Sequence, residues 1–126
     1  MTKAQIRKLD ALAGTITRQR GSCQKCHTTE TLQAAHIIGR KIHATAWQQA
    51  NLLCLCARCH AMFHDRPLEF SAFVNGLLGV DHADRLNRLS KVLAPDIKPR
   101  LTYDEVVRML DDDLDTWEKR IFSKEG

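Results

Sequence analysis

Four cysteines form two C-x-x-C pairs, Cys23 with Cys26 and Cys56 with Cys59, and 29 residues separate the pairs. A C-x-x-C turn can direct both of its sulfurs at one ion, and four thiolates satisfy the tetrahedral geometry of a structural zinc site. The ion would close the intervening residues into a hairpin. The spacing therefore predicts a four-cysteine zinc site, and the fifth cysteine, Cys54, is expected to be a small core residue.

Other uses of these cysteines fit the spacing less well. An odd number of cysteines, in a chain expected to reside in a reducing compartment, argues against a disulfide framework. A C2H2 finger on the second cysteine pair would take its histidines from His60 and His64. It fails because such a finger needs about twelve residues between its cysteine and histidine pairs. The remaining alternative is that the cysteines are reactive or merely buried.

A pair of histidines directly follows the second cysteine pair. His60 and His64 are four residues apart, so on a helix both imidazoles project from one face and could clamp a metal ion. Such a pair is also common as surface decoration. A zinc-anchored Cys59 would fix the start of this helix rigidly, which favours the metal-binding interpretation. Of the other histidines, His27 is expected to be structural or at the surface, and His82 to be solvated on a helix.

The elements that must position these side chains follow from hydrophobic spacing. Residues 3–20 predict an amphipathic helix that ends at Gly21. Because Gly14 weakens a helix, two shorter helices are the alternative. Residues 31–38 and 51–55 are short apolar runs that predict two strands, joined by a long polar connection over residues 39–50. A helix over about residues 59–64 follows. The core, residues 21–66, is therefore expected to be a ββα unit.

The second half of the chain, residues 67–126, is expected to be a helical extension that enlarges the small core. Helices are predicted over residues 67–78, between Pro67 and a Gly79 cap, and over residues 82–93. Residues 95–100 are expected to be a linker. Thr102 and Glu105 resemble a capping box that opens one further helix. The apolar face of that helix consists of Val107, Leu110, Leu114, Trp117 and Ile121.

Composition and charge narrow the classes of protein. The 126 residues are 44% hydrophobic and 27% charged, close to a soluble globular average and the size of one domain. Neither a membrane span nor a signal peptide is evident, so a cytoplasmic location is expected. Residues 1–66 carry ten Lys/Arg and three acidic residues, a net charge of +7, whereas residues 67–126 have a net charge of −3. The basic half holds the cysteines, which suggests a polyanionic partner.

Two short strings resemble the HNH nuclease family. They are Ala35-His36-Ile37 and the run from Asn51 through Leu55-Cys56-x-x-Cys59-His60-x-x-x-His64. The family has a ββα-metal fold that is often clipped by two C-x-x-C pairs, as expected here. The string over residues 35–40, the segment over residues 44–47 and the helical tail look most like small phage HNH proteins, some of which are grouped with recombination nucleases of the Rap/NinG type.

The resemblance implies a metal-dependent DNA endonuclease that leaves 5′-phosphate and 3′-hydroxyl ends. Three matching positions form the catalytic set: His36 as general base, Asn51 as a brace for the hairpin loop, and His60 as a ligand of the catalytic ion. His64 would be a second ligand of that ion, Mg²⁺ or another divalent cation, separate from the structural Zn²⁺. A neutral imidazole can accept a proton near pH 7, as the role of His36 requires.

The chain departs from the family at Ala35, where many members carry an Asp or His that is another metal ligand. The catalytic ion would have two protein ligands, which implies weak binding of that ion without DNA. Ala35 also supports an alternative function. The chain could be a non-catalytic zinc module that binds nucleic acid or a phage or host protein.

Cationic side chains near the expected base are candidate phosphate contacts. They are Arg40, Lys41, His43 and Arg58, with Arg18 and Arg20 as further candidates. Each could instead be solvated, and His43 could supply a third metal contact. Trp47 is expected to pack over the hairpin, the alternative being a wedge into DNA. The resemblance implies DNA as the partner, with phage recombination or packaging proteins beside it, in the cytoplasm of a bacterial host cell.

Overall fold

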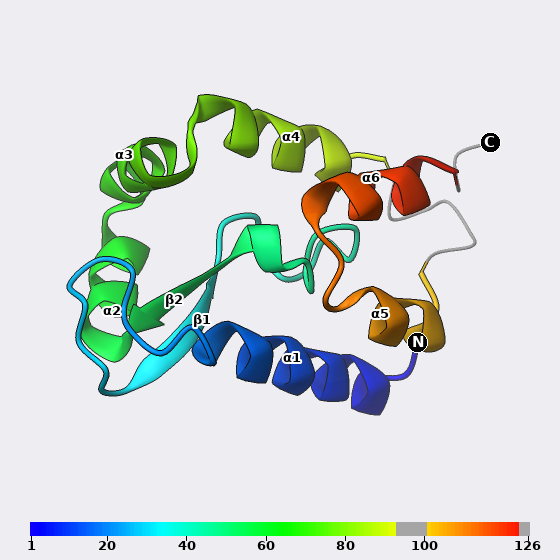
Figure 1. Cartoon of the computed structure of the whole chain (residues 1–126), viewed down its shortest axis with the longest axis horizontal. Helices are drawn as coiled ribbons and strands as arrows, with labels where there is room; N and C mark the ends of the chain where they lie inside the picture. The colour runs from blue at the N-terminus through cyan, green and yellow to red at the C-terminus, as the bar shows by residue number, and fades with distance from the viewer. Residues whose placement is uncertain (93–100, 124–126) are drawn as a thin grey trace.

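The structure is a computed structural model that describes residues 1–92 and 101–123 (Figure 1). These residues form six α-helices and one two-stranded sheet, which confirms the predicted mixture of helices with a small sheet. The elements are α1 (Lys3–Arg18), β1 (Leu32–His36), the 3₁₀ turn η1 (Gln49–Asn51), β2 (Leu52–Cys56), α2 (Ala57–Asp65), α3 (Pro67–Leu78), α4 (Val80–Ser90), α5 (Tyr103–Met109) and α6 (Leu114–Ser123). None of the helices in the described residues is both long and apolar enough to cross a membrane.

Helix α1 is continuous through Gly14 and begins with a complete capping box. The Thr2 hydroxyl accepts the Gln5 N–H at 3.1 Å, and the Gln5 side chain accepts the Thr2 N–H at 2.9 Å. This arrangement satisfies two backbone donors that the first turn would otherwise leave free. The helix ends at Arg18, two residues before the predicted end, and Gly21 then turns the chain with φ +89°.

The two strands form an antiparallel hairpin. Leu32 lies opposite Cys56, and His36 lies opposite Leu52. All five residues of β2 are buried, because helices and loops cover both faces of this strand. Both predicted strands are confirmed with slightly different ends. The second begins one residue late because residues 49–51 form the turn η1.

Helix α2 packs on both strands and completes the ββα unit. It begins at Ala57, two residues before the predicted start, because Cys56 is its N-cap. The Cys56 sulfur accepts the backbone N–H of Cys59 at 3.4 Å. Helices α3 and α4 follow, and Gly79 caps α3 with φ +90°, as predicted. Leu93 and the predicted linker at residues 95–100 lie outside the described residues.

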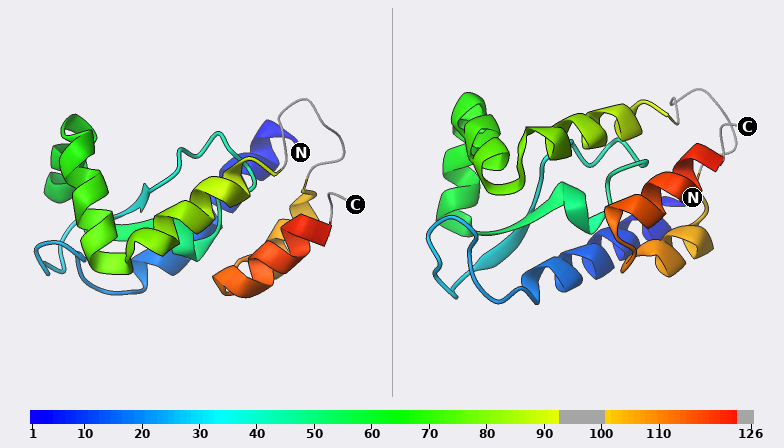
Figure 2. Two further views of the ribbon diagram at one scale, coloured as in Figure 1. Left: turned by 90° about the horizontal axis from the view of Figure 1, so that it is seen from above. Right: turned by 45° about the horizontal axis from the view of Figure 1, so that its top comes forward.

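The core consists of two hydrophobic clusters at opposite ends of the molecule. One joins α1, the connection before η1, α4, α5 and α6, and contains Trp47 and Trp117. The other joins the hairpin, the cysteine turns, α2 and α3, and contains Phe63. Figures 1 and 2 show α2 and α3 at one end and α5 and α6 at the other, with the hairpin between them. Strand β2 contributes Leu52 to the first cluster and Leu53 to the second.

The connection between the strands is less polar than predicted. Its residues 44–48 are all buried, with exposed fractions of 0–1%. Trp47 is confirmed as a packing residue, and its ring N–H donates to Asp10 of α1 at 2.8 Å. Buried loops are rare because their backbone polar groups are cut off from water. The carbonyls of this segment must therefore find donors elsewhere in the protein.

The single C-terminal helix predicted from Thr102 onward is wrong. The chain forms α5 and α6 with a turn over residues 110–113. The run of aspartates favours this turn, since an Asp side chain competes for nearby backbone N–H groups. Asp113 accepts the N–H of Thr116 at 2.8 Å. Val107, predicted on the apolar face, is 40% exposed, whereas Val106 is buried.

Candidate metal centre and histidine cavity

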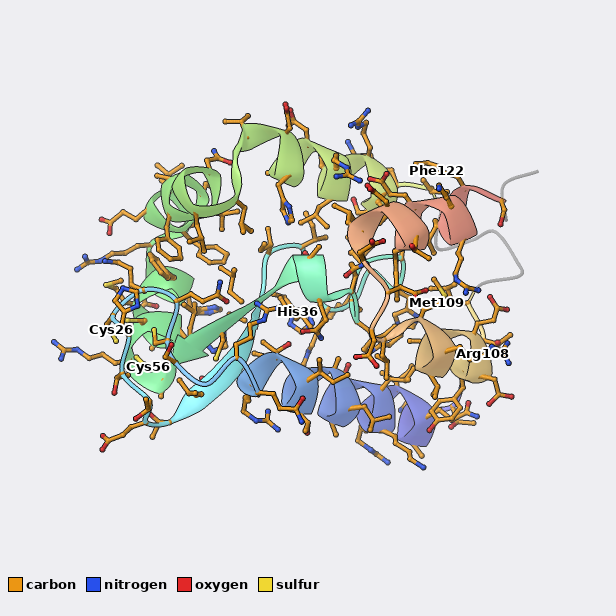
Figure 3. All side chains as sticks on the ribbon, viewed as in Figure 1. Cys26, His36, Cys56, Arg108, Met109 and Phe122 are labelled. Carbon is orange, nitrogen blue, oxygen red and sulfur yellow. The ribbon has the colours of Figure 1, made fainter. Side chains whose placement is uncertain are left out.

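Four cysteine sulfurs converge beside the open end of the hairpin, all within 4.8 Å of one another. Cys23 and Cys26 lie on the turn after α1, Cys56 ends β2, and Cys59 lies in the first turn of α2. Figure 3 shows Cys26 and Cys56 close together, and their sulfurs are 3.7 Å apart. Four zinc-bound sulfurs in a tetrahedron are about 3.8 Å apart. The cluster could therefore hold a metal ion and is compatible with structural zinc.

Backbone N–H groups point at sulfurs in both C-x-x-C turns. The Cys26 N–H donates to Cys23 Sγ at 3.5 Å, and the Cys59 N–H donates to Cys56 Sγ at 3.4 Å. Burial alone would raise the pKa of Cys23, but the hydrogen bonds prevail and lower it to about 6. Burial, followed by the neighbouring sulfurs, raises the pKa of Cys59 to about 12. A thiolate at Cys23 thus disfavours a second one at Cys59, and a bound cation would offset this repulsion.

The fifth cysteine is outside this cluster. Cys54 is 0% exposed, lies opposite Ala34 in the sheet, and has a pKa raised by burial. Its predicted place in the core is confirmed. His27, on the turn of the first cysteine pair, is exposed and has φ +69°.

Three histidines line one cavity of about 250 Å³ between the hairpin and α2. His36 comes from the end of β1, and His60 and His64 come from successive turns of α2. The remaining lining residues are small or apolar: Ala35, Ile37, Gly39, Phe63, Pro67 and Phe70. The structure thus brings the predicted general base and both predicted ligands of the second ion to one cavity.

The hydrogen bond of His36 defines its tautomer. Its Nε2 lies 2.9 Å from the backbone oxygen of Ala46. A carbonyl oxygen can only accept, so Nε2 carries the hydrogen and, in the neutral ring, Nδ1 carries the lone pair. Burial lowers the pKa of His36 below 6.5, although the Ala46 carbonyl opposes this shift. At neutral pH the ring is therefore an unprotonated base with Nδ1 available.

The opposite nitrogen is available on His60. Its Nδ1 lies 2.8 Å from the side-chain oxygen of Gln33, so Nδ1 donates and Nε2 carries the lone pair. Burial, and then the nearby His64, lower the pKa of His60. A neutral imidazole with its second nitrogen held by an amide oxygen is a favourable metal ligand. His64 is exposed.

Asn51 braces the connection between the strands. It is 0% exposed, and its side-chain oxygen accepts the N–H of Ile38 at 2.7 Å. Its amide nitrogen donates to the carbonyls of Ile38 and Thr45, each at 3.0 Å. Both polar atoms of its side chain therefore bond to the backbone, and Asn51 braces the connection.

We expect Asn51→Ala to destabilise the fold by about 3 kcal/mol, because it leaves one buried and two partly buried backbone groups without partners. Urea unfolding followed by circular dichroism measures the change. Asn75→Ala is the matched control, since Asn75 is exposed on α3 and its side chain makes no hydrogen bond within the described residues. Equal stability of the two variants would contradict the bracing role.

The candidate phosphate contacts fall into two groups. Arg40, Lys41 and Arg58 are exposed and make no hydrogen bond or ion pair with the described part of the chain. Arg20 instead donates to the carbonyls of Gln49 and Leu52, a structural role that the sequence does not reveal.

Arg18 donates to the hydroxyl of Thr15 on its own helix. The ring of His43 is half-buried against Trp47, with ring centroids 4.8 Å apart, and burial lowers its pKa. His43 does not line the histidine cavity, so the structure does not bring it to His60 and His64.

Two long-range hydrogen bonds to the connection carry no sequence signal. His82, predicted to be solvated, is half-buried, and its Nε2 donates to the carbonyl of Ala50 at 2.7 Å. The ring N–H of Trp117 donates to the carbonyl of Ala44 at 2.7 Å. Both join residues more than 30 positions apart.

Comparisons with protein-family models, curated proteins and solved structures found no match. Within the described residues, the four cysteines are the one group of three or more metal-binding side chains that comes together. The histidine cavity is a separate feature, lined by two histidines of α2 and one of β1.

Proposed function

We propose that this chain is a metal-dependent endonuclease of the HNH type, which hydrolyses phosphodiester bonds in DNA to 5′-phosphate and 3′-hydroxyl ends. The observation that carries the proposal is the convergence of His36, His60 and His64 on one cavity of a ββα unit. The order of elements, the two C-x-x-C pairs and the bracing asparagine support the same assignment.

The histidines divide the chemistry between them. His36 would accept the proton of the attacking water at Nδ1, since Nε2 is engaged by Ala46. His60 and His64 would hold a divalent cation such as Mg²⁺, which would supply electrostatic stabilisation of the negative charge that develops during phosphodiester cleavage. Ala35 is 2% exposed and offers no donor atom, so two imidazoles are the protein ligands proposed here.

The charge distribution supports DNA as the partner. The half of the chain that contains the cavity has a net charge of +7. Its exposed Arg40, Lys41 and Arg58 are free of intramolecular ion pairs within the described residues, so they can contact phosphates without breaking a bond. We propose that the chain acts in phage DNA recombination or processing, in the cytoplasm of a bacterial host.

A plasmid-nicking assay with Mg²⁺, Mn²⁺ or Ni²⁺ tests the proposal. We expect cleavage by the wild-type chain, whereas His60→Ala should retain bound zinc and the fold but lose cleavage by about a hundredfold or more. His60→Ala also loses the hydrogen bond to Gln33, so Gln33→Ala is compared with it. Gln33→Ala keeps the imidazole and loses only its orienting partner, so it should lose less activity than His60→Ala.

A second outcome of the same assay would favour another function. Ala35 stands where many HNH proteins have a metal ligand, which is the observation in favour of a non-catalytic zinc module. Absence of cleavage with every metal, together with DNA binding in a gel-shift assay, would support that module and contradict the endonuclease. Gross unfolding of His60→Ala would mark His60 as structural.

A further inference from the structure

Three consecutive carbonyls of the buried connection accept hydrogen bonds from side chains of three different elements. The Ala44 oxygen accepts from Trp117 of α6, the Thr45 oxygen from Asn51 of η1, and the Ala46 oxygen from His36 of β1. The general base is therefore bonded to a backbone segment that is itself held two residues away by the C-terminal helix.

Trp117 is well placed to hold that segment. It is 0% exposed, and its ring N–H lies 2.7 Å from the carbonyl of Ala44, which is 1% exposed. Helix α6 is attached to α4 by Arg85, which pairs with both Asp115 and Glu118. On the other side of Ala46, Trp47 is tied to Asp10 of α1. The carbonyl that meets His36 thus lies between two anchored residues.

We propose that Trp117 is a positioning residue for His36: by holding the Ala44 carbonyl, it fixes the backbone that presents the Ala46 carbonyl to Nε2–H of the imidazole. Helix α6 then helps to position the active site, in addition to contributing to the hydrophobic core. This inference rests on the proposed nuclease function, in which His36 must expose Nδ1 as a base.

Loss of the indole N–H would act on the tautomer of His36. A buried carbonyl without a donor is costly, so the Ala44 peptide would shift toward another partner. The peptide that presents the Ala46 oxygen would move with it, since the two lie in one short buried segment. With a weaker acceptor at Nε2, the imidazole would populate the Nδ1–H form, which cannot accept a proton at Nδ1.

The test compares Trp117→Phe, which keeps an aromatic ring but removes the donor, with Ile121→Val. Ile121 is also buried on α6 and its truncation weakens packing without touching the carbonyls. Imidazole ¹⁵N spectra of the zinc-loaded chain report the tautomer of His36. We expect Trp117→Phe to raise the Nδ1–H population and lower kcat about tenfold, with KM within about twofold. Ile121→Val should leave the Nδ1–H population of His36 and kcat unchanged.

If Trp117→Phe does not fold, 3-benzothienylalanine in place of Trp117 keeps the two-ring shape and replaces the N–H by sulfur. An unchanged His36 tautomer in the folded variant, or the same change in Ile121→Val, would overturn the inference. A wild-type chain that cleaves no DNA would contradict the proposed function, and the tautomer measurement would still decide whether Trp117 positions His36.

Discussion

Replacing Cys56 by serine is expected to abolish stoichiometric zinc binding and to unfold the hairpin. Serine is a favourable N-cap residue and can still accept the N–H of Cys59, so the change removes a thiolate while preserving the start of α2. Structural zinc contributes roughly 10–16 kcal/mol to the folding of small domains, well above the usual stability of a domain of this size. Zinc content by mass spectrometry and circular dichroism after purification measure the effect.

Cys54→Ala is the matched control for this experiment. Cys54 is two residues away on the same strand and buried, but its sulfur is outside the cluster. The control should retain one zinc ion and lose about 1 kcal/mol of stability through the small cavity it creates. Full zinc occupancy in Cys56→Ser would show that the four cysteines are not the ligand set.

His36→Gln is expected to reduce DNA cleavage by a factor of about 10² to 10⁴, the usual contribution of a general base. A glutamine side chain can place an N–H near the position of the imidazole Nε2 and donate to the Ala46 carbonyl. It has no basic nitrogen to accept a proton from water. Single-turnover cleavage of a labelled duplex, with saturating metal, measures the loss.

The matched control is His27→Asn. His27 is exposed on the first cysteine turn at φ +69°, and asparagine is among the residues that adopt this conformation most readily. Its cleavage rate should be close to that of the wild-type chain. Cleavage that survives His36→Gln at the wild-type rate would exclude His36 as the base.

The parts of this structure that the sequence predicts best are those governed by local spacing. Two C-x-x-C pairs identify a four-sulfur cluster because each turn is short enough to fix its own geometry. Pro67 and Gly79 mark the ends of α3 because each has a distinct backbone preference. His60 and His64 share a cavity because a helix repeats every 3.6 residues.

The parts that the sequence does not predict depend on contacts between distant residues. Alanines 44 and 46 have little side chain to signal their role, yet their carbonyls meet Trp117 and His36. His82 lies in a polar helical sequence that predicts exposure, but its ring donates a hydrogen bond to the carbonyl of Ala50 in the connection between the strands. The break between α5 and α6 escapes prediction because a regular apolar spacing continues across aspartates that favour a turn.

The positions of the cysteines also bear on the entropy of the unfolded chain. Cys26 and Cys56 are 30 residues apart, and His36, Asn51 and the buried connection all lie between them. An ion bound to both would cross-link the chain and restrict this whole interval before it folds, by an amount that grows with the logarithm of loop length. No cysteine lines the histidine cavity. The cavity would nevertheless form and disappear with the ion, because four of its nine lining residues, among them His36, belong to the loop that the ion closes.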